Sequence, residues 1–320
     1  MQTVAEIKQS ARDQKVAFEL VLLVKKTQMK RAKNNSEFLM VELGDRTGMF
    51  HLVCFENSAN FSFFQEQGEG KVVRVRGHTD HYQGRFSPNI AQVEIVRDEE
   101  MGRYLENLVE TAPIPLDALW KETQEHIEAI ENPALRETVR IALDELDGRF
   151  QTTPGAISMH HAYRGGLMEH TVRMARACRA LLPLYPEVHA DLALAGILLH
   201  DIGKALEYTP SLATTRSQSG ILQGHVVLGY RQVRRAALQS KLAEPLLERL
   251  EHIILSHQGE LEWGAAAKAA TPEAVFVSMV DNLDAKMGMV QYALRSTPAD
   301  EEFSEFVAGL GAPLLTRSAR

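Results

Sequence analysis

A pair of residues that could bind a metal ion follows an apolar segment in the second half of this 320-residue chain. In LALAGILLHDIGK, His200 and Asp201 come directly after the apolar run, and Gly203 follows them. An apolar helix is buried, so both polar side chains need partners that replace water. Imidazole and carboxylate are good ligands for divalent ions such as manganese, iron, zinc or magnesium. The pair therefore indicates a metal site, although two side chains that only cap the helix would leave the same pattern.

Two further residues favour the metal site over the helix cap. His170 lies in GGLMEHTVRMARA, where the spacing of apolar residues indicates a packed amphipathic helix. Asp281 interrupts the apolar run of AVFVSMVDNLDAKMGMV, where an ionised carboxylate without a cation would be costly. The histidines also gather in the same part of the chain, between residues 160 and 257. The first set of candidate ligands is therefore His170, His200, Asp201 and Asp281.

The ordered series His, His-Asp, Asp resembles the signature of the HD superfamily of metal-dependent phosphohydrolases. The segments HHAYRGGLMEHT, LLHDIGK, GILQGH, ILSHQGELEWG and VDNLDAKM are similar to the HD domain of the YhaM-type 3′→5′ exoribonucleases, which also carry an N-terminal OB-fold. The resemblance covers most of the chain and includes the order of its domains. It implies a helical bundle in which a metal-activated water cleaves the 3′-terminal phosphodiester of RNA and releases nucleoside 5′-monophosphates.

The same resemblance implies roles for residues near the first set. His225 and His257 match positions that hold a second ion in binuclear members, where Asp201 would bridge the two ions. Related proteins often have another histidine after position 257, whereas this chain has Gln258, which leaves one or two ions open. Lys204 is similar to the lysine of HD-x-G-K motifs, which approaches the substrate phosphate, although a lysine there could also complement a helix dipole. The expected ions are manganese or, alternatively, iron, magnesium, cobalt or nickel.

Other polar residues beside these ligands are candidates for supporting roles. Glu169 and Asp284 lie close in sequence to a ligand and could orient it. His252 lies five residues before a candidate ligand, off its helical face, and is either a ligand or a core residue. His161 and Arg164 precede the first ligand helix in a glycine-flanked loop and could line the substrate path.

The elements that would position these residues fall into two domains. From residue 16 to about residue 96, five short β-rich runs separated by turn signals predict a small closed barrel, an all-β OB-fold. After it the spacing becomes helical, which predicts an all-α HD-domain helical bundle with helices around 166–182, 187–201, 222–239, 242–257 and 272–294. We therefore expect an OB-fold nucleic-acid-binding domain at 1–98, a linker at 99–115, an HD phosphohydrolase domain at 116–310 and a C-terminal tail at 311–320.

Charge is divided unevenly between these parts. The formal net charge is −7; residues 1–98 hold 14 of the 35 basic and 12 of the 42 acidic residues, or +2, which leaves 21 against 30, or −9, for the rest. A surface for a polyanion should therefore lie in the first domain. The segment KKTQMKRAKNNS, expected as a loop between the first two strands, is free of acids, and such a loop contacts nucleic acid in an OB-fold. Its candidate RNA contacts are Lys25, Lys26, Lys30, Arg31 and Lys33.

Composition excludes several classes of protein. No apolar run approaches the roughly 18 to 20 residues of a membrane span, and the first residues lack the apolar core of a signal peptide. We therefore expect a soluble, cytoplasmic protein. Cys54 and Cys178 are isolated, so neither a disulfide framework nor a zinc ribbon is indicated.

Three functions are compatible with these features. The first is a 3′→5′ exoribonuclease acting on single-stranded RNA, with single-stranded DNA as a further candidate substrate. The second is an HD phosphohydrolase of a small nucleotide or cyclic dinucleotide, whose OB domain would be regulatory or oligomerising. The third is a nucleic-acid-binding protein without catalytic activity. The basic segment argues against the second and the intact ligand series against the third; self-association as a homo-oligomer stays open.

Overall fold

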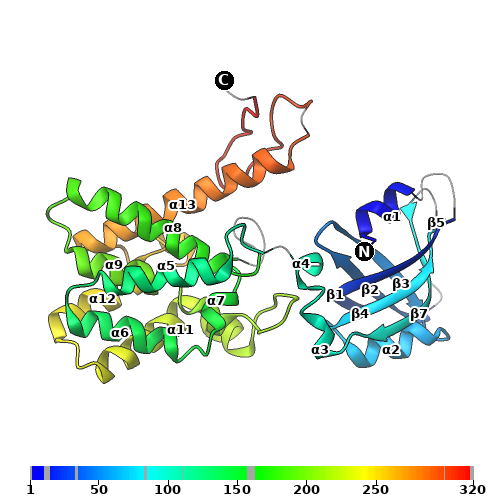
Figure 1. The fold of residues 1–320 in the computed structure, drawn as a ribbon, viewed down its shortest axis with the longest axis horizontal. Helices are drawn as coiled ribbons and strands as arrows, with labels where there is room; N and C mark the ends of the chain where they lie inside the picture. Colours follow the sequence, from blue (N-terminus) through cyan, green and yellow to red (C-terminus); the bar gives the residue numbers. More distant parts are fainter. Residues whose placement is uncertain are drawn as a thin grey trace. The chain divides into compact units, whose positions relative to one another are not determined.

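The chain forms two compact units, which are described separately (Figure 1). Residues 1–111 together with Ser211–Thr214 make up the first unit, and residues 112–210 together with 215–320 make up the second. The computed structural model describes residues 2–10, 15–32, 35–82, 85–109, 111–156, 163–298 and 300–317.

The first unit is built on a five-stranded antiparallel sheet with the strand order β3-β2-β1-β4-β7. Buried and exposed residues alternate along β3, with Phe50, Leu52 and Cys54 inward, because one face of the sheet covers the core. β3 and β7 are its edges, and no ladder joins them in the described residues, so the expected barrel is partly open, as OB-folds are. The five expected strands are confirmed: β1 (Ala17–Arg31), β2 (Glu37–Asp45), β3 (Gly48–Phe55), β4 (Val72–His78) and β7 (Asn89–Ile95).

Short helices close the core of this unit. Val4 and Ile7 of α1, with Phe61 and Phe64 of α2, pack into the same buried cluster as the inner face of the sheet. Leu108 of α4 belongs to a second buried cluster, so the stretch expected as a linker is partly folded onto the first unit. The remaining elements are α1 (Val4–Ser10), α2 (Ala59–Gln67), β5 (His81–Tyr82), β6 (Arg85–Phe86), α3 (Asp98–Met101) and α4 (Leu105–Leu108).

The basic segment after Val24 is a strand over most of its length. β1 continues to Arg31 and pairs with β2, with Thr27 opposite Val41. A bulge between Val24 and Lys26 shifts the register at the point where the apolar part of β1 ends. The stretch KKTQMKR contains neither glycine nor proline, so nothing in its backbone prevents a ladder with β2. The prediction of a loop was wrong for this stretch.

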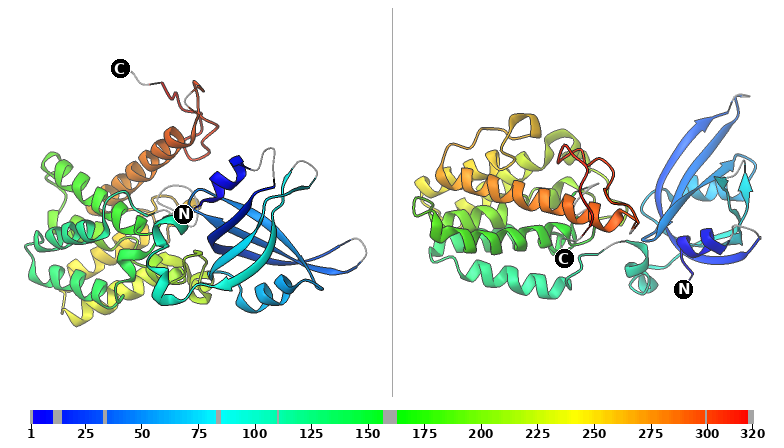
Figure 2. Two further views of the ribbon diagram at one scale, coloured as in Figure 1. Left: turned by 45° about the vertical axis from the view of Figure 1, so that its right-hand side comes forward. Right: turned by 90° about the horizontal axis from the view of Figure 1, so that it is seen from above.

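The second unit is helical, as expected (Figure 2). α9 packs against α6, α8, α12 and α13, and every residue from Leu192 to Leu199 is buried. A helix that is apolar on all sides is buried on all sides, so α9 is the central helix and His200 follows it inside the bundle. The helices are α5 (Leu116–Glu128), α6 (Pro133–Asp144), α7 (Arg149–Thr152), α8 (Gly166–Leu181), η1 (Leu182–Leu184), α9 (Ala190–Leu199), α10 (Lys204–Glu207), α11 (Gln218–Gln239), α12 (Glu244–Ser256), η2 (Leu261–Trp263) and α13 (Pro272–Ser296).

Beyond α13 the chain folds back on itself as an irregular hairpin within residues 300–317. The backbone N–H of Ser304 donates to the oxygen of Leu314 (2.8 Å), and that of Val307 donates to the oxygen of Ala312 (3.2 Å). The first residues of the stretch expected as a C-terminal tail therefore pair with the residues that follow α13.

Two further expectations concern the whole chain. Among the described residues, no helix is both long and apolar enough to cross a membrane. Cys54 and Cys178 are free and buried, and burial raises the pKa of each thiol to about 12.

Candidate metal centre

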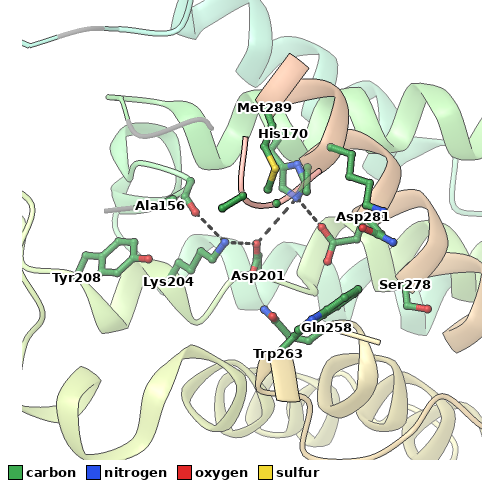
Figure 3. A pocket seen from close by; sticks show the side chains of 16 residues that line it. Ala156, His170, Asp201, Lys204, Tyr208, Gln258, Trp263, Ser278, Asp281 and Met289 are labelled. Carbon is green, nitrogen blue, oxygen red and sulfur yellow. Dashed lines mark hydrogen bonds and ion pairs between the residues drawn. The ribbon is translucent and has the colours of Figure 1, made fainter. Parts of the chain in front are cut away.

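A cavity of about 570 Å³ in the helical unit is lined by three of the candidate ligands, His170, Asp201 and Asp281 (Figure 3). This volume lies within the range of sites that hold a small ligand. The other three candidate ligands, His200, His225 and His257, lie against Asp201 of this lining. The six side chains come from five helices or their ends: His170 from α8, His200 and Asp201 from the turn after α9, His225 from α11, His257 from the end of α12 and Asp281 from α13.

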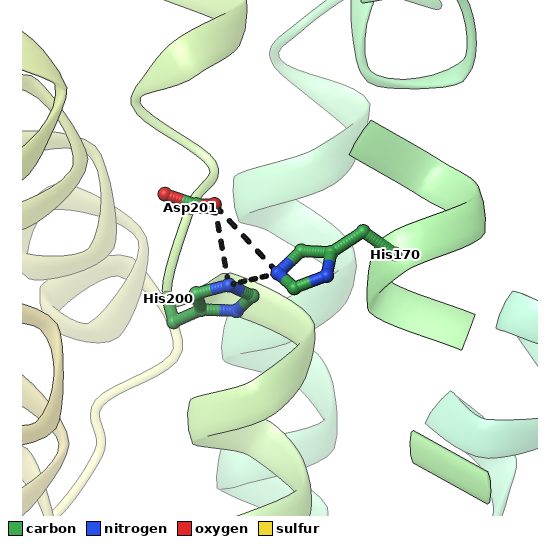
Figure 4. Close-up of side chains that lie close together, drawn as sticks. All are labelled: His170, His200 and Asp201. Atoms are coloured by element: carbon green, nitrogen blue, oxygen red, sulfur yellow. Dashed lines mark hydrogen bonds and ion pairs between the residues drawn. The ribbon is translucent and has the colours of Figure 1, made fainter. Parts of the chain in front are cut away.

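Three members of the first set, His170, His200 and Asp201, form a buried cluster (Figure 4). Nε2 of His200 lies 3.3 Å from Oδ2 of Asp201 and 3.3 Å from Nε2 of His170. Nε2 of His170 also lies 3.2 Å from Oδ1 of Asp281. His170, His200 and Asp201 therefore lie close enough together to share one ion, and Asp281 adjoins them through His170.

A second set of ligands faces the other oxygen of the same carboxylate. Nε2 of His225 and Nε2 of His257 each lie 3.5 Å from Oδ1 of Asp201. This oxygen is buried and has no hydrogen-bond partner in the part of the chain that the structure describes. The carboxylate of Asp201 thus lies between two pairs of imidazoles, as a bridging ligand would.

Backbone carbonyls orient two of the imidazoles. Nδ1 of His200 lies 2.7 Å from the oxygen of Ile197, and Nδ1 of His257 lies 2.7 Å from the oxygen of Ile254. A carbonyl only accepts, so these partners assign the proton to Nδ1 and leave the lone pair of each neutral ring on Nε2. Both lone pairs then point toward Asp201.

The Asp284 carboxylate orients the third imidazole. Its Oδ2 lies 2.8 Å from Nδ1 of His170, and its Oδ1 accepts a hydrogen bond of 2.7 Å from Nε of Arg173. A carboxylate behind a histidine fixes the ring and its tautomer. The orienting role considered for Asp284 is therefore compatible with its position, whereas the buried Glu169 accepts a bond of 2.6 Å from the hydroxyl of Tyr163.

Glu207 holds the fourth imidazole in the same way. Its Oε2 lies 2.9 Å from Nδ1 of His225, and its Oε1 accepts a bond of 2.9 Å from Nε of Arg216. Glu207 is buried, which is unusual for a glutamate without partners of this kind. Sequence reasoning missed this residue, because a single acid in KALEYTP carries no periodic or motif signal.

The donor set fits a divalent cation. Four imidazole nitrogens and several carboxylate oxygens converge in a buried space, where the carboxylates need positive charge nearby, from a cation or from a proton on a ring. Burial lowers the pKa of His170, but hydrogen bonds to Asp281 and Asp284 outweigh it and raise the pKa to about 9. Burial likewise raises the pKa of Asp201, yet the charge of Lys204 and the adjacent His200 hold it well below its usual value. The oxygen of Asp201 without a partner is the plainest sign that the set fits an ion.

Two glycines allow α11 to approach this cluster. Gly224 has a φ of +68° and interrupts the helix directly before His225, which redirects the imidazole. A Cβ at Gly203 would lie 1.9 Å from the backbone oxygen of His225 and 2.6 Å from the nitrogen of Gly229. Only glycine at position 203 therefore lets the turn after Asp201 pack against α11.

Gln258 occupies the position directly after His257, where the resemblance led us to expect a further histidine. Its Nε2 is 3.0 Å from Nε2 of His225 and 3.3 Å from Nε2 of His257. Rotation of the amide would place its oxygen at the same point, since the two ends of the amide are exchangeable. His252, by contrast, uses Nε2 to accept a bond of 2.8 Å from the backbone of Ala270, away from the second set.

Cationic side chains line the cavity beside the ligands. Nζ of Lys204 lies 2.6 Å from Oδ2 of Asp201 and donates to the oxygen of Gly155 at 2.7 Å, and Lys286 also lines the cavity. Arg164 is half-buried and is not among the described residues of the lining. His161, also expected near the substrate path, lies outside the described residues.

The basic candidates of the first unit lie on the strand that continues past the core. Lys26, Lys30 and Arg31 are exposed and Lys25 is half-buried, while Lys33 lies outside the described residues. Nε of Arg31 is 3.0 Å from Oε1 of Glu37 on the neighbouring strand. An exposed pair of this kind is weak, so the guanidinium can exchange this partner for another anion.

Comparison with known proteins agrees with both units. Residues 167–286 match the HD domain, and residues 21–99 match the OB-fold nucleic acid binding domain. The chain is 32% identical to the 3′-5′ exoribonuclease YhaM of Shouchella clausii (strain KSM-K16), over 90% of this chain and 89% of the relative. It is 30% identical to the protein of the same name from Geobacillus sp. (strain WCH70), over 91% of this chain and 89% of the relative. It is also 30% identical to the protein of the same name from Bacillus subtilis (strain 168), over 88% of this chain and 88% of the relative. With both domains matched and relatives aligned along most of its length, the chain belongs to the YhaM family.

Proposed function

We propose that this chain is a metal-dependent 3′→5′ exoribonuclease that hydrolyses single-stranded RNA to nucleoside 5′-monophosphates. The observation that carries the proposal is the position of Asp201, whose two oxygens face two different pairs of imidazoles. The family supports it, since the relatives named above carry the name 3′-5′ exoribonuclease.

Each oxygen of Asp201 defines one proposed ion site. His170, His200 and Asp281 complete the first site, and His225 and His257 complete the second. Gln258 would contribute its amide oxygen to the second site after rotation of the amide. Carboxylate and amide oxygens mixed with imidazole suit manganese, and they suit soft thiophilic ions less. Bound there, divalent ions would lower the pKa of a water and polarise the phosphodiester for in-line attack.

The side chains of the cavity act on the substrate. Lys204 and Lys286 place positive charge where the phosphoryl oxygens gain negative charge. The water oxygen bonds to phosphorus while the bond from phosphorus to the preceding 3′-oxygen breaks. The attacking water loses a proton and the leaving oxygen gains one, so the remaining strand ends in a 3′-hydroxyl and can enter another round. The products are a nucleoside 5′-monophosphate and an RNA shorter by one nucleotide.

The OB-fold unit would hold the body of the strand. The exposed Lys26, Lys30 and Arg31 supply phosphate contacts that do not depend on base sequence. Contacts to phosphate alone do not discriminate between RNA and DNA, so single-stranded DNA is a second candidate ligand of this surface.

A ladder assay tests the proposed function. The purified protein with Mn²⁺ should shorten a 5′-labelled RNA oligomer one nucleotide at a time, and His200→Ala or Asp201→Ala should abolish the ladder. His51→Ala, an exposed histidine on β3, is the matched control and should keep it. An intact oligomer together with hydrolysis of a cyclic dinucleotide would identify a small-nucleotide phosphohydrolase instead. Binding of the oligomer without hydrolysis of either substrate would identify an inactive binding protein.

A further inference from the structure

A second cavity adjoins the one that contains the candidate ligands. It has a volume of about 750 Å³ and lies between the C-terminal half of α13 and residues 301–308. Both cavities are lined by Met289 and Ala308, so the two spaces meet at these residues. A chain that enters the first cavity by its end can therefore continue into the second.

Three exposed aromatic side chains line this second cavity. Tyr292 on α13 is 54% exposed, and Phe303 and Phe306 on the hairpin are 52% and 67% exposed. Large apolar side chains that gather on one solvent-filled surface mark a binding site more often than chance exposure does. Aromatic rings that are more than half exposed can stack on a planar ligand.

The polar groups of the second cavity suit nucleobases better than phosphates. Its lining includes the carboxylates of Glu301 and Glu305 and the hydroxyls of Ser296 and Thr297. Neither lysine nor arginine occurs among the described residues of the lining, so it offers no charge that neutralises a phosphate. Carboxylates and hydroxyls can accept hydrogen bonds from base amino groups. A strand would therefore lie with its bases inward and its phosphates in solvent.

The hairpin fixes the two phenylalanines in place. Between them, the buried Ser304 accepts a hydrogen bond of 2.9 Å from the backbone of Leu314, and its own N–H donates to the oxygen of the same residue at 2.8 Å. Phe303 forms an antiparallel bridge with Leu315 on the returning arm. A backbone held in this way presents its aromatic rings with little loss of entropy when a ligand binds.

We propose that the second cavity is a nucleobase-binding subsite for the RNA nucleotides immediately 5′ of the scissile bond, whose bases stack on Tyr292, Phe303 and Phe306. This inference rests on the proposed function, because a 3′→5′ exoribonuclease keeps the rest of the strand outside the cavity where the terminal bond is cut. The space that adjoins that cavity is the shortest exit for the strand.

A second copy of this chain is a poorer occupant of the same surface. A two-fold interface centred there would bring each copy's Glu301 and Glu305 toward the same residues of its partner, and buried like charges cost free energy. Single-stranded RNA lowers this cost when its uncharged bases face the carboxylates and its phosphates stay in solvent.

Substrate length separates the subsite from the catalytic cavity. The full-length protein with Mn²⁺ should have a lower KM for a short oligoribonucleotide than for a dinucleotide, because only the oligomer reaches the second cavity. Phe306→Ala and Tyr292→Ala should each raise the KM for the oligomer by about 5- to 150-fold, the range expected for the loss of one stacked base. Phe306→Trp should keep the low KM, since it retains an aromatic face. Leu184→Ala, which removes an equally exposed apolar side chain from η1, should leave both KM values at the wild-type level.

Each other outcome has a distinct meaning. An oligomer KM that stays unchanged in Phe306→Ala would overturn the subsite while leaving the exoribonuclease activity in place. An equal rise for oligomer and dinucleotide would overturn it as well, because the cavity with the ligands would then have been disturbed. A fall in the mass measured by sedimentation for Phe306→Ala would identify an interface between copies instead. Wild-type protein that cleaves the dinucleotide but never shortens RNA would refute the proposed function itself.

Discussion

Backbone carbonyls hold two imidazoles of the cluster in place, and carboxylates hold the other two. His200 and His257 follow the last residues of α9 and α12, where the carbonyls of the last turn have no intrahelical partner and can accept from Nδ1. His170 lies inside α8, where such carbonyls are already bonded, and His225 directly follows the interruption of α11 at Gly224. Asp284 and Glu207 take the place of the carbonyl for these two rings.

The role of Glu207 can be tested by a change of a single atom. Glu207→Gln can present an amide nitrogen as well as an oxygen to Nδ1 of His225, so the ring loses its fixed tautomer. We expect Mn²⁺ affinity or the rate of RNA hydrolysis to fall by about 10- to 100-fold, the usual effect of removing such a partner. Calorimetric titration with Mn²⁺ and the ladder assay measure the two quantities.

Glu251→Gln is the control for this change. Glu251 pairs with the exposed Arg234 and has no contact with the ligands. Equal Mn²⁺ affinity in Glu207→Gln and the wild type would remove Glu207 from the proposed site. At the scale of residues, the sequence predicted the candidate ligands that belong to a motif. Glu207 could not be predicted, because only the fold brings it to His225.

At the scale of elements, pairing with a neighbouring strand determines the structure of the one stretch whose sequence pattern was misleading. The apolar runs of the first unit and the amphipathic spacing of the second predicted strands and helices correctly. For the polar stretch after Val24 we predicted a loop, because polar residues without alternation carry no strand signal. The neighbouring β2 supplies its ladder, and tertiary context of this kind overrides local preference.

Gly203 joins two elements at the proposed site, and its replacement should separate them. A Cβ at this position would overlap backbone atoms of α11, which cannot move aside as a flexible side chain could. We expect Gly203→Ala to lower the free energy of unfolding by about 1–3 kcal/mol, as overpacking does, and to weaken Mn²⁺ binding. Urea unfolding and metal titration test this, with Gly102→Ala as the control.

Gly102 suits that control for two reasons. Its φ of −54° is open to any residue, and a Cβ there would meet no atom within 4 Å. Similar unfolding curves for Gly203→Ala and Gly102→Ala would contradict the close approach of α10 and α11.

His126 makes the stability of α5 depend on pH. The ring is buried, and neither nitrogen has a hydrogen-bond partner among the described residues. Burial lowers its pKa below the usual 6.5; nearby Glu122 opposes the shift, while Arg179 and Arg176 add to it. The neutral ring is favoured by the folded state, so its contribution is complete above about pH 6.5 and is lost as the pH falls toward the lowered pKa.

His126→Phe removes the group that titrates while keeping a ring in the core. The urea concentration at the unfolding midpoint of the wild type should decrease when the pH is lowered from about 7.5 to about 5.5. That of the variant should decrease less. An equal fall in both proteins would show that other groups cause the pH dependence.

At the scale of the whole molecule, the excess of basic residues lies in the first unit, where we propose that RNA phosphates bind. The sequence predicted both domain types and their order, because each has its own periodicity, and it placed the basic excess in the first. It could not predict the hairpin within residues 300–317 or the second cavity. These features depend on backbone pairing between residues such as Ser304 and Leu314, whose types carry no signal.

The proposed RNA contacts on β1 can be tested through the salt dependence of RNA binding. Replacing Lys26 and Lys30 with alanine should weaken RNA binding and lower the slope of log K against log salt by about 1.4, if each makes one phosphate contact to a single strand. Fluorescence anisotropy over a salt series measures this slope. Lys15→Ala removes an exposed lysine that pairs with Asp80 and should leave it unchanged. A double variant with the wild-type slope would place the strand elsewhere.

The shared carboxylate of Asp201 has a consequence for how the two proposed sites fill. Its oxygens belong to one delocalised group on one short side chain, so an ion at either site fixes the rotamer and the charge that the other site receives. The two binding events are then thermodynamically linked, and each ion changes the affinity of the other by the same factor. A metal titration of this protein should therefore depart from two independent binding isotherms, and the size of the departure reports the free energy transmitted through a single residue.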